Sequence, residues 1–269
     1  MSRDITRILE GWEFEPNQVS VRIVQGDDGR EKIQMRMDLG LLQMEVNGRP
    51  DGQRPEGFDS WLEYYQHQQR QHEQTQPDSV YLIETSDCER LLREGIQYYH
   101  RYLSFWHLRR YELCARDTTR NLRLFRFVRE HARQERDKRQ FDQWRPYVTM
   151  MHTRAVATPL VELQDLPAAI TAIEAGIISI RQFLEEYDQL ERAGQCSELL
   201  YLQRWRDELL AQSPPPDAPP AEPPSVLGDL QRQLTEAIAA ERFEEAAQLR
   251  DEIRRRSEAP FQPPSGEKL

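Results

Sequence analysis

The chain has 269 residues, of which 30% are charged, and it carries a net charge of −10 at neutral pH. Its mean hydropathy of −0.82 indicates a polar, soluble protein, although an aromatic fraction of 9% is enough to fill a core. The longest apolar run is too short to span a bilayer, and the charged N-terminus lacks the apolar segment of an export signal. We therefore expect a cytoplasmic protein with no membrane segment.

The three cysteines are scattered along the chain and form no CxxC pair. This spacing is typical of reduced core or surface residues rather than of a disulfide or a zinc site. The cysteines are Cys88, Cys114 and Cys196.

Residues 19–46 alternate apolar and polar side chains with a period of two, which predicts strands with one buried face each. The Gly and Asp residues of "GDDG" at 26–29 favour a tight hairpin, and "DLG" at 38–40 favours a second reversal. We expect a three-stranded antiparallel meander within residues 1–57, with its apolar face on the helices that follow. The inward residues are predicted to be Val19, Val21 and Ile23, then Ile33, Met35 and Met37, then Leu42, Met44 and Val46.

Residues 58–212 show helical spacing and predict a helical bundle. The first helix is expected to start with Asp59 or Ser60 as its N-cap, and the second with Ser86 or Asp87. A third helix is expected to extend from about residue 117 to Arg136, with one apolar face. The face of the second helix that we expect to be buried contains Leu92, Ile96, Tyr99, Leu103 and Trp106.

Two helix pairs within this region resemble each other, since "TRNLRLFRFVRE" and "EAGIISIRQFLEE" each form the second helix of a pair. Such pairs are loosely similar to tetratricopeptide repeats, but they recur at about fifty residues instead of ~34. Repeat-like packing with a concave peptide-binding face and a plain α-bundle are both left open.

A basic segment interrupts the acidic chain, because residues 101–139 hold twelve Arg or Lys against five Asp or Glu. Arginines at steps of three and four form a stripe that is able to contact phosphates. The alternative, which we favour, is a solvated helix face neutralised by acids such as Glu130 and Glu135, with aromatic residues on the opposite side. The candidate nucleic-acid contacts are Arg116, Arg120, Arg123 and Arg126.

We find no catalytic constellation and expect no enzymatic activity, no cofactor and no metal site. "GDDG" lacks the Gly-Lys-Ser/Thr of a phosphate loop, and Asp27 and Asp28 are interpreted as turn residues. His100 and His107 share a helix face, but no Cys or acid joins them at ligand spacing. We interpret all six histidines as packing or surface residues; the other four are His67, His72, His131 and His152.

Residues 213–225 form a linker in which more than half of the positions are proline, which favours an extended, semi-rigid spacer. Residues 226–257 then predict an αα-hairpin, with Ser225 as a possible N-cap and a narrow apolar seam. Residues 258–269 are expected to be a disordered tail. About thirty residues bury too little surface to fold alone, so we expect another chain to cover the seam.

The seam and its charged rim supply the candidate partner-binding residues. Leu, Ile and Phe are expected to anchor the partner, the two alanines to let backbones approach, and the charges to set pairing. These residues are Leu230, Leu234, Ile238, Phe243, Glu244, Ala246, Ala247, Leu249, Arg250, Asp251 and Ile253. A second copy of the chain and a different protein with a complementary hairpin are both possible partners.

The segment "RFEEAAQLRDEI" resembles the UVR motif, a helical hairpin found in the UvrB and UvrC subunits of nucleotide excision repair and in regulators of Clp-type proteolysis. The resemblance covers residues 227–256, and the layout of the whole chain is similar to bacterial UVR-motif proteins. It implies protein–protein contact through this hairpin. The chain shows neither the helicase or nuclease motifs of the repair subunits nor the paired CxxC motifs of the Clp regulators, so only the docking module is implied.

Taken together, the sequence predicts an α+β, mainly α protein that acts as a non-catalytic adaptor, with a possible link to DNA repair or stress proteolysis. The alternative is a DNA-repair accessory factor that contacts nucleic acid through the arginine-rich helix 116–136.

Overall fold

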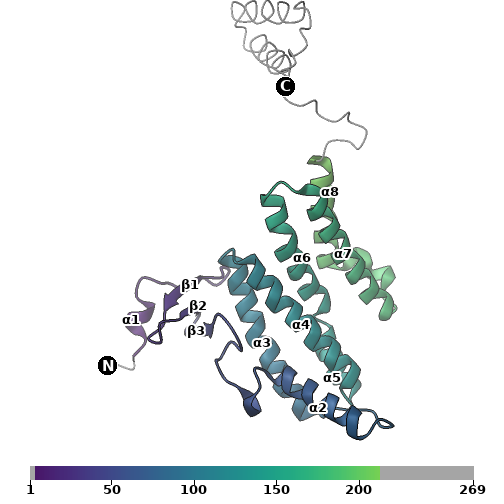
Figure 1. The fold of residues 1–269 in the computed structure, drawn as a ribbon. Helices are drawn as coiled ribbons and strands as arrows, with labels where there is room; N and C mark the ends of the chain where they lie inside the picture. Colours follow the sequence, from purple (N-terminus) through teal and green to yellow (C-terminus); the bar gives the residue numbers. More distant parts are fainter. Residues whose placement is uncertain (1–3, 213–269) are drawn as a thin grey trace, which may run out of the picture. The chain divides into compact units, whose positions relative to one another are not determined.

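The computed structural model describes residues 4–212 (Figure 1). The linker, hairpin and tail expected beyond Gln212 lie outside these residues. Within the described part, a small sheet precedes a set of long helices, as expected for an α+β, mainly α chain. The elements are α1 Thr6–Leu9, β1 Val21–Gln25, β2 Glu31–Met37, β3 Gly40–Glu45, the 3-10 turn η1 Pro55–Gly57, α2 Trp61–Thr75, α3 Thr85–His107, α4 Tyr111–His131, α5 Glu135–Asp142, α6 Arg145–Glu162, α7 Leu166–Glu186, η2 Leu190–Gln195 and α8 Ser197–Gln212.

The predicted meander is confirmed, with strand order β1-β2-β3 and antiparallel pairing throughout. Ile33 lies opposite Ile23 and Met44, so the inward residues of the three strands meet across the sheet. Ile33, Met35 and Met44 are buried in the main core. The apolar face of the sheet therefore packs on the helices, as its alternation requires.

The middle strand departs from the expectation of one buried face, because the polar residues Lys32 and Gln34 are buried as well. Gln34 accepts a hydrogen bond from Nε of Arg22 and donates one to Gln43, both 2.9 Å long. Lys32 forms ion pairs with Asp28 and Glu45. These neighbouring polar side chains cover the second face, which alternation alone does not reveal.

The helices pack in sequence order, with α3 against α4, α4 against α6, α6 against α7 and α7 against α8 (Figure 1). The two expected helix pairs are therefore α3–α4 and α6–α7, while their likeness to tetratricopeptide repeats stays a prediction. The first expected N-cap is confirmed at Ser60, whose Oγ accepts from the amide of Glu63 at 3.1 Å. No helix within residues 4–212 combines the length and hydropathy needed to cross a bilayer.

The prediction for α3 was wrong in two respects. Its N-cap is Glu84 instead of Ser86 or Asp87, and the carboxylate of Asp87 accepts from the amide of Glu84 at 3.0 Å in a capping box. The expected core face is also turned partly outward, since Ile96 is 47% exposed. The buried face instead carries Leu91 and Phe105 together with two charged residues, Glu94 and Arg101. A helix face that includes charged residues is not recognised as a core face from the sequence.

The helix expected to run to Arg136 ends at His131, which is a second correction. Ala132 is extended, because the amide of Ile83 donates to the carbonyl of His131 at 2.8 Å and the amide of Arg133 donates back to Ile83 at 3.1 Å. This one-residue parallel bridge replaces the helical bonds and lets α5 start in a new direction.

A buried ion pair joins the sheet to the helices. Arg101 on α3 and Asp117 on α4 are each 1% exposed, and they form a two-pronged contact of 2.6 and 3.0 Å. The remaining nitrogen of Arg101 donates to the carbonyls of Glu45 and Gly48 at 3.0 and 2.8 Å, just after β3. One guanidinium thus ties together two helices and the end of the sheet.

Glu94 anchors the start of α2 in the same way. Its carboxylate is fully buried and accepts from the backbone amides of Trp61 and Leu62 at 2.7 and 3.2 Å. A carboxylate in this position satisfies amides that have no partner inside the helix and complements the helix dipole. Arg120 on α4 and Arg49 in the loop after β3 balance its charge.

We predict that Asp117→Asn lowers the free energy of unfolding by about 3–5 kcal/mol, because it leaves the buried guanidinium of Arg101 without a countercharge. Urea unfolding of the full chain measures this. Asp207→Asn is the matched control, since Asp207 pairs with Arg206 at the surface and a change below about 1 kcal/mol is expected. Equal effects of the two substitutions would contradict the assigned role of the buried pair.

Candidate functional site

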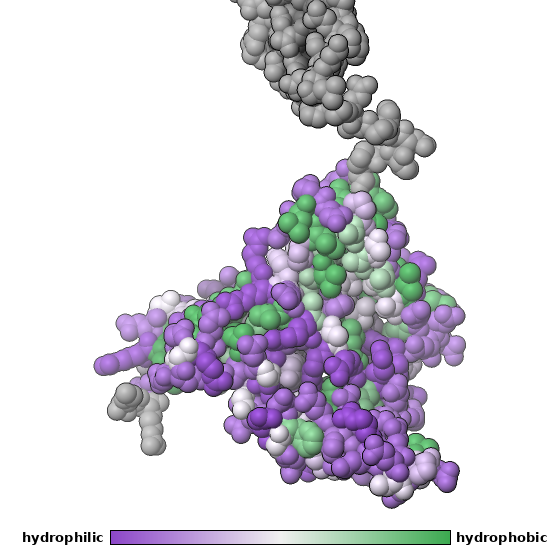
Figure 2. Space-filling model, viewed as in Figure 1, coloured by the Kyte–Doolittle hydropathy of each residue, from purple (hydrophilic) through white to green (hydrophobic). Residues whose placement is uncertain are grey.

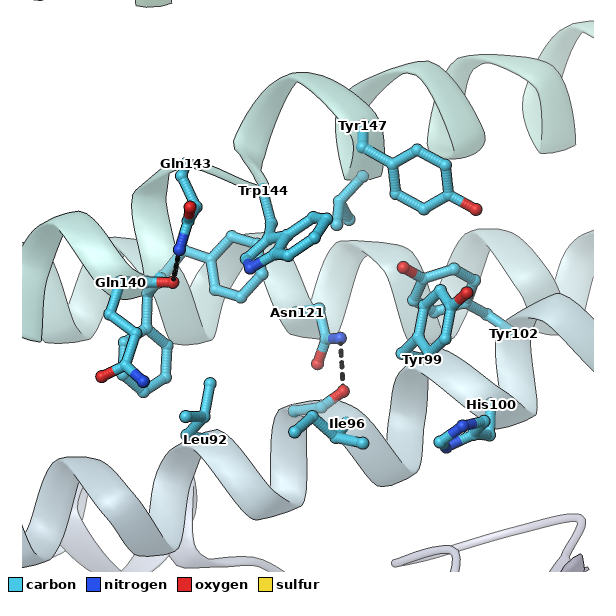
Figure 3. A pocket seen from close by; sticks show the side chains of 14 residues that line it. Leu92, Ile96, Tyr99, His100, Tyr102, Asn121, Gln140, Gln143, Trp144 and Tyr147 are labelled. Carbon is cyan, nitrogen blue, oxygen red and sulfur yellow. Dashed lines mark hydrogen bonds between the residues drawn. The ribbon is translucent and has the colours of Figure 1, made fainter.

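The described residues enclose a pocket of about 640 Å³ between α3 on one side and the α5–α6 segment on the other, with α4 as its floor (Figure 3). Leu92, Ile96 and Tyr99 of α3 face Trp144 and Tyr147 across it. The volume is in the range of small-molecule sites. The pocket lies on the face of α3 that the sequence predicted to be buried in the core. The apolar residues of this face therefore line a cavity.

Buried aromatic side chains form the deep part of the pocket. Phe125 and Phe141 are buried and contact each other edge to face, with ring centroids 6.1 Å apart. Val148 is buried beside them, while Trp144 is 54% exposed at the mouth. The pocket therefore has a preformed apolar interior and an apolar mouth open to solvent.

Asn121 is the polar group on the floor, and its orientation is fixed from both ends. Its amide nitrogen donates to the carbonyl of Gly95 at 3.0 Å, and its oxygen accepts from Arg120 at 3.2 Å (Figure 3). A Cβ atom at Gly95 would lie 3.1 Å from Leu124, so glycine lets α3 approach α4 closely here.

Three tyrosines gather at one end of the pocket (Figure 3). The Tyr99 ring lies 5.6 Å from that of Tyr102 and 6.3 Å from that of Tyr147. Burial raises the pKa of Tyr147 to about 12 and also raises that of Tyr102, while burial lowers the pKa of His100. This end of the pocket is therefore uncharged near neutral pH.

The arginines of α4 divide into two groups. Arg116 contacts Asp117 at 3.0 Å and bonds to the loop after β3, and Arg120 pairs with Glu94 and lies 4.1 Å from the Tyr98 ring centroid. These two side chains hold the fold together. Arg123 and Arg126 are exposed on the helix surface.

The acids expected to neutralise this helix are different from those that do so. Glu135 pairs with Lys138 instead of with an arginine of the stripe. Arg129 pairs with Glu186, and Arg133 pairs with Glu84. The aromatic rings are not confined to the opposite side either, since Arg116 and Arg120 lie over Phe105 and Tyr98.

The candidate histidines and cysteines occupy packing positions. His67 contacts the Phe58 ring, His72 contacts Tyr81, and Nδ1 of His152 lies 3.1 Å from the hydroxyl of Thr118. Cys88 and Cys114 are buried, Cys196 is partly buried, and all three are free thiols, as their spacing indicated. Across residues 4–212, no three His, Cys, Asp or Glu side chains are grouped as metal ligands.

The predicted partner-binding residues, Leu230 to Ile253, lie outside the described residues, so the structure does not place them. The pocket was missed from the sequence for two reasons. The stripe at Leu92, Ile96 and Tyr99 was visible, but it was interpreted as core, and α5, which supplies Phe141, was not expected as a separate helix.

The comparisons with known proteins concern the C-terminal part of the chain. A family model described as the UvrB/uvrC motif, UVR, matches residues 225–257. This confirms the resemblance found in the sequence and assigns this segment to a motif of protein interaction. The searches of curated proteins and of solved structures found no match.

We predict that the stability of the protein falls as the pH is lowered below about 6.5, partly through His152. Burial lowers the pKa of His152 below its ordinary value of 6.5, so the unfolded chain binds more protons than the folded one in this range. His152→Gln should flatten the dependence of the urea midpoint on pH between about 7.5 and 5.5. His67→Gln, on another helix, is the control, and an unchanged slope in His152→Gln would contradict the assignment.

Proposed function

We propose that the protein is a non-catalytic adaptor of the cytoplasm that docks a protein partner through the hairpin of residues 226–257. The observation that carries this proposal is the match of residues 225–257 to the UVR motif. It is supported by the apolar seam that the sequence predicts from Leu230 to Ile253, which is too small to form a core of its own. The link to DNA repair or stress proteolysis comes from the motif alone.

We propose a separate role for each segment of the chain. The sheet and helices of residues 4–212 form one compact body, held by the Arg101–Asp117 and Glu94 contacts. Residues 213–225 act as a spacer, and residues 258–269 as a tail. In this scheme the α3–α4 and α6–α7 pairs stack as tetratricopeptide-like units, and the body presents cargo or a signal while the hairpin docks.

Partner choice rests on the seam and its rim. Leu, Ile and Phe side chains supply affinity, and Glu244, Arg250 and Asp251 select the partner by complementary charge. A hairpin of similar design completes a four-helix bundle in a coiled-coil-like manner. Either a second copy of this chain or a different protein provides it.

We predict that Phe243→Asp lowers recovery of the partner in affinity capture by at least about tenfold, because a carboxylate in an apolar seam loses its hydration without compensation. Phe261→Asp, outside the motif, is the matched control and should retain the partner. Thermal unfolding should show that the body is unchanged in both variants, and light scattering separates self-association from a different partner. Recovery of the same proteins with Phe243→Asp would disprove the proposal.

A second candidate is a DNA-repair accessory factor that contacts nucleic acid through α4. The observation that favours it is the exposure of Arg123 and Arg126, one helical turn apart, although Arg116 and Arg120 are engaged inside the protein. Two exposed arginines provide few phosphate contacts, so we rank this function second.

Titration of duplex DNA against salt tests this candidate. If α4 binds DNA, the double substitution Arg123→Gln and Arg126→Gln should weaken binding and reduce the salt slope by about two. Arg204→Gln with Arg206→Gln on α8 is the control, since it removes the same charge elsewhere. Absence of salt-dependent binding by the unmodified protein would eliminate this candidate.

A further inference from the structure

The docking that we propose for residues 226–257 makes no use of the pocket between α3 and the α5–α6 segment. We propose that this pocket binds an uncharged small molecule with an aromatic body and a hydrogen-bond acceptor at one end. The inference goes beyond the adaptor function and stands without it, because it rests only on residues 92–148. Three features carry it: the absence of charge in the lining, the apolar interior and the hydroxyl groups at one end.

The lining excludes an ionised ligand. Among the residues that the structure describes, those around the pocket include no Asp, Glu, Lys or Arg. The buried carboxylates next to lining residues in the sequence are already paired, Glu94 with Arg120 and Asp142 with Arg145. A charged ligand would lose its hydration and gain no countercharge, which is unfavourable.

The interior favours an aromatic body. Phe125, Phe141 and Trp144 line a cavity of about 640 Å³. Figure 3 shows Leu92 on the wall opposite Trp144. Flat rings gain from edge-to-face and offset contacts with such side chains in addition to the area that they bury. The exposed ring of Trp144 stands where it can cover a bound molecule.

The tyrosine end of the pocket supplies hydroxyl donors. Tyr102 and Tyr147 line the pocket, and burial raises the pKa of both, so their hydroxyls stay protonated near neutral pH. Asn121 has two amide protons, and the structure gives an acceptor to one of them. A ligand carbonyl or ether oxygen near these groups would accept a hydrogen bond from them.

The test uses prodan, an uncharged naphthalene dye that carries one ketone and whose emission shifts to the blue in an apolar site. The full chain is expected to bind one equivalent saturably. Ile96→Lys places a charge at the mouth and should weaken binding by about tenfold. Ile96 is 47% exposed, so the protein tolerates this change, and Ile178→Lys on α7, at a residue 55% exposed, is the matched control with less than about a twofold effect expected.

Two further measurements separate this site from non-specific dye binding. Anilinonaphthalene sulfonate, which is an aromatic anion, should bind the unmodified protein at least about tenfold more weakly than prodan and should bind Ile96→Lys better than the parent. Tyr102→Phe should weaken prodan binding by about fivefold through loss of one hydrogen bond.

The inference is overturned if prodan does not saturate, if the anion binds as tightly, or if the Ile178 and Ile96 variants behave alike. Phe243→Asp should leave prodan binding unchanged, so this result and the result for partner docking are independent.

Discussion

The burial of two carboxylates and their arginines is the constraint on which the rest of the structure depends. Asp117 and Glu94 have left water, and each is compensated only because elements from distant parts of the chain meet around it. Removal of either partner would leave an isolated charge, so the network tolerates one arrangement of β3, α2, α3 and α4. A small sheet of three strands, which is marginal by itself, gains a fixed place on the helices through this requirement. The surface in Figure 2 is largely hydrophilic, with hydrophobic patches toward the ends of α6 and α8. Beneath this surface lies a hydrophobic core, and the buried charges fix the relative placement of elements that apolar burial holds together.

The same network explains which parts of the fold could be predicted from the sequence. The sheet was predictable because alternation and two turns are local signals, and the N-cap at Ser60 is local as well. The orientation of α3 was not, because both of its sides carry large apolar residues and the buried side also carries Glu94 and Arg101. The end of α4 could not be predicted for a related reason, because the residue that terminates it, Ile83, lies about fifty positions away in the sequence. Long-range pairing of this kind leaves no periodic trace.

The two candidate sites also differ in how far they could be predicted from the sequence. The docking hairpin is visible as a contiguous pattern of about thirty residues, which the UVR family model also matches. The pocket is assembled from four helices, α3, α4, α5 and α6, and none of its residues is unusual in its own segment. The four candidate arginines of α4 look alike in the sequence, yet two of them, Arg116 and Arg120, compensate buried carboxylates and the other two face solvent. Their roles depend on partners far along the chain, which is why charge counting overestimates the surface available to phosphates.

The bridge between Ile83 and Ala132 has a consequence for the natural variation of the protein. Its two hydrogen bonds use only backbone atoms, while the side chains of Ile83 and Ala132 are buried in the core. The bridge also constrains the number of residues between α4 and α5, because an added or lost position shifts the point at which α5 starts. One insertion would carry Phe141 away from the pocket wall. Homologous chains that keep the pocket should therefore conserve the number of residues between α4 and α5, together with a small apolar residue at position 132.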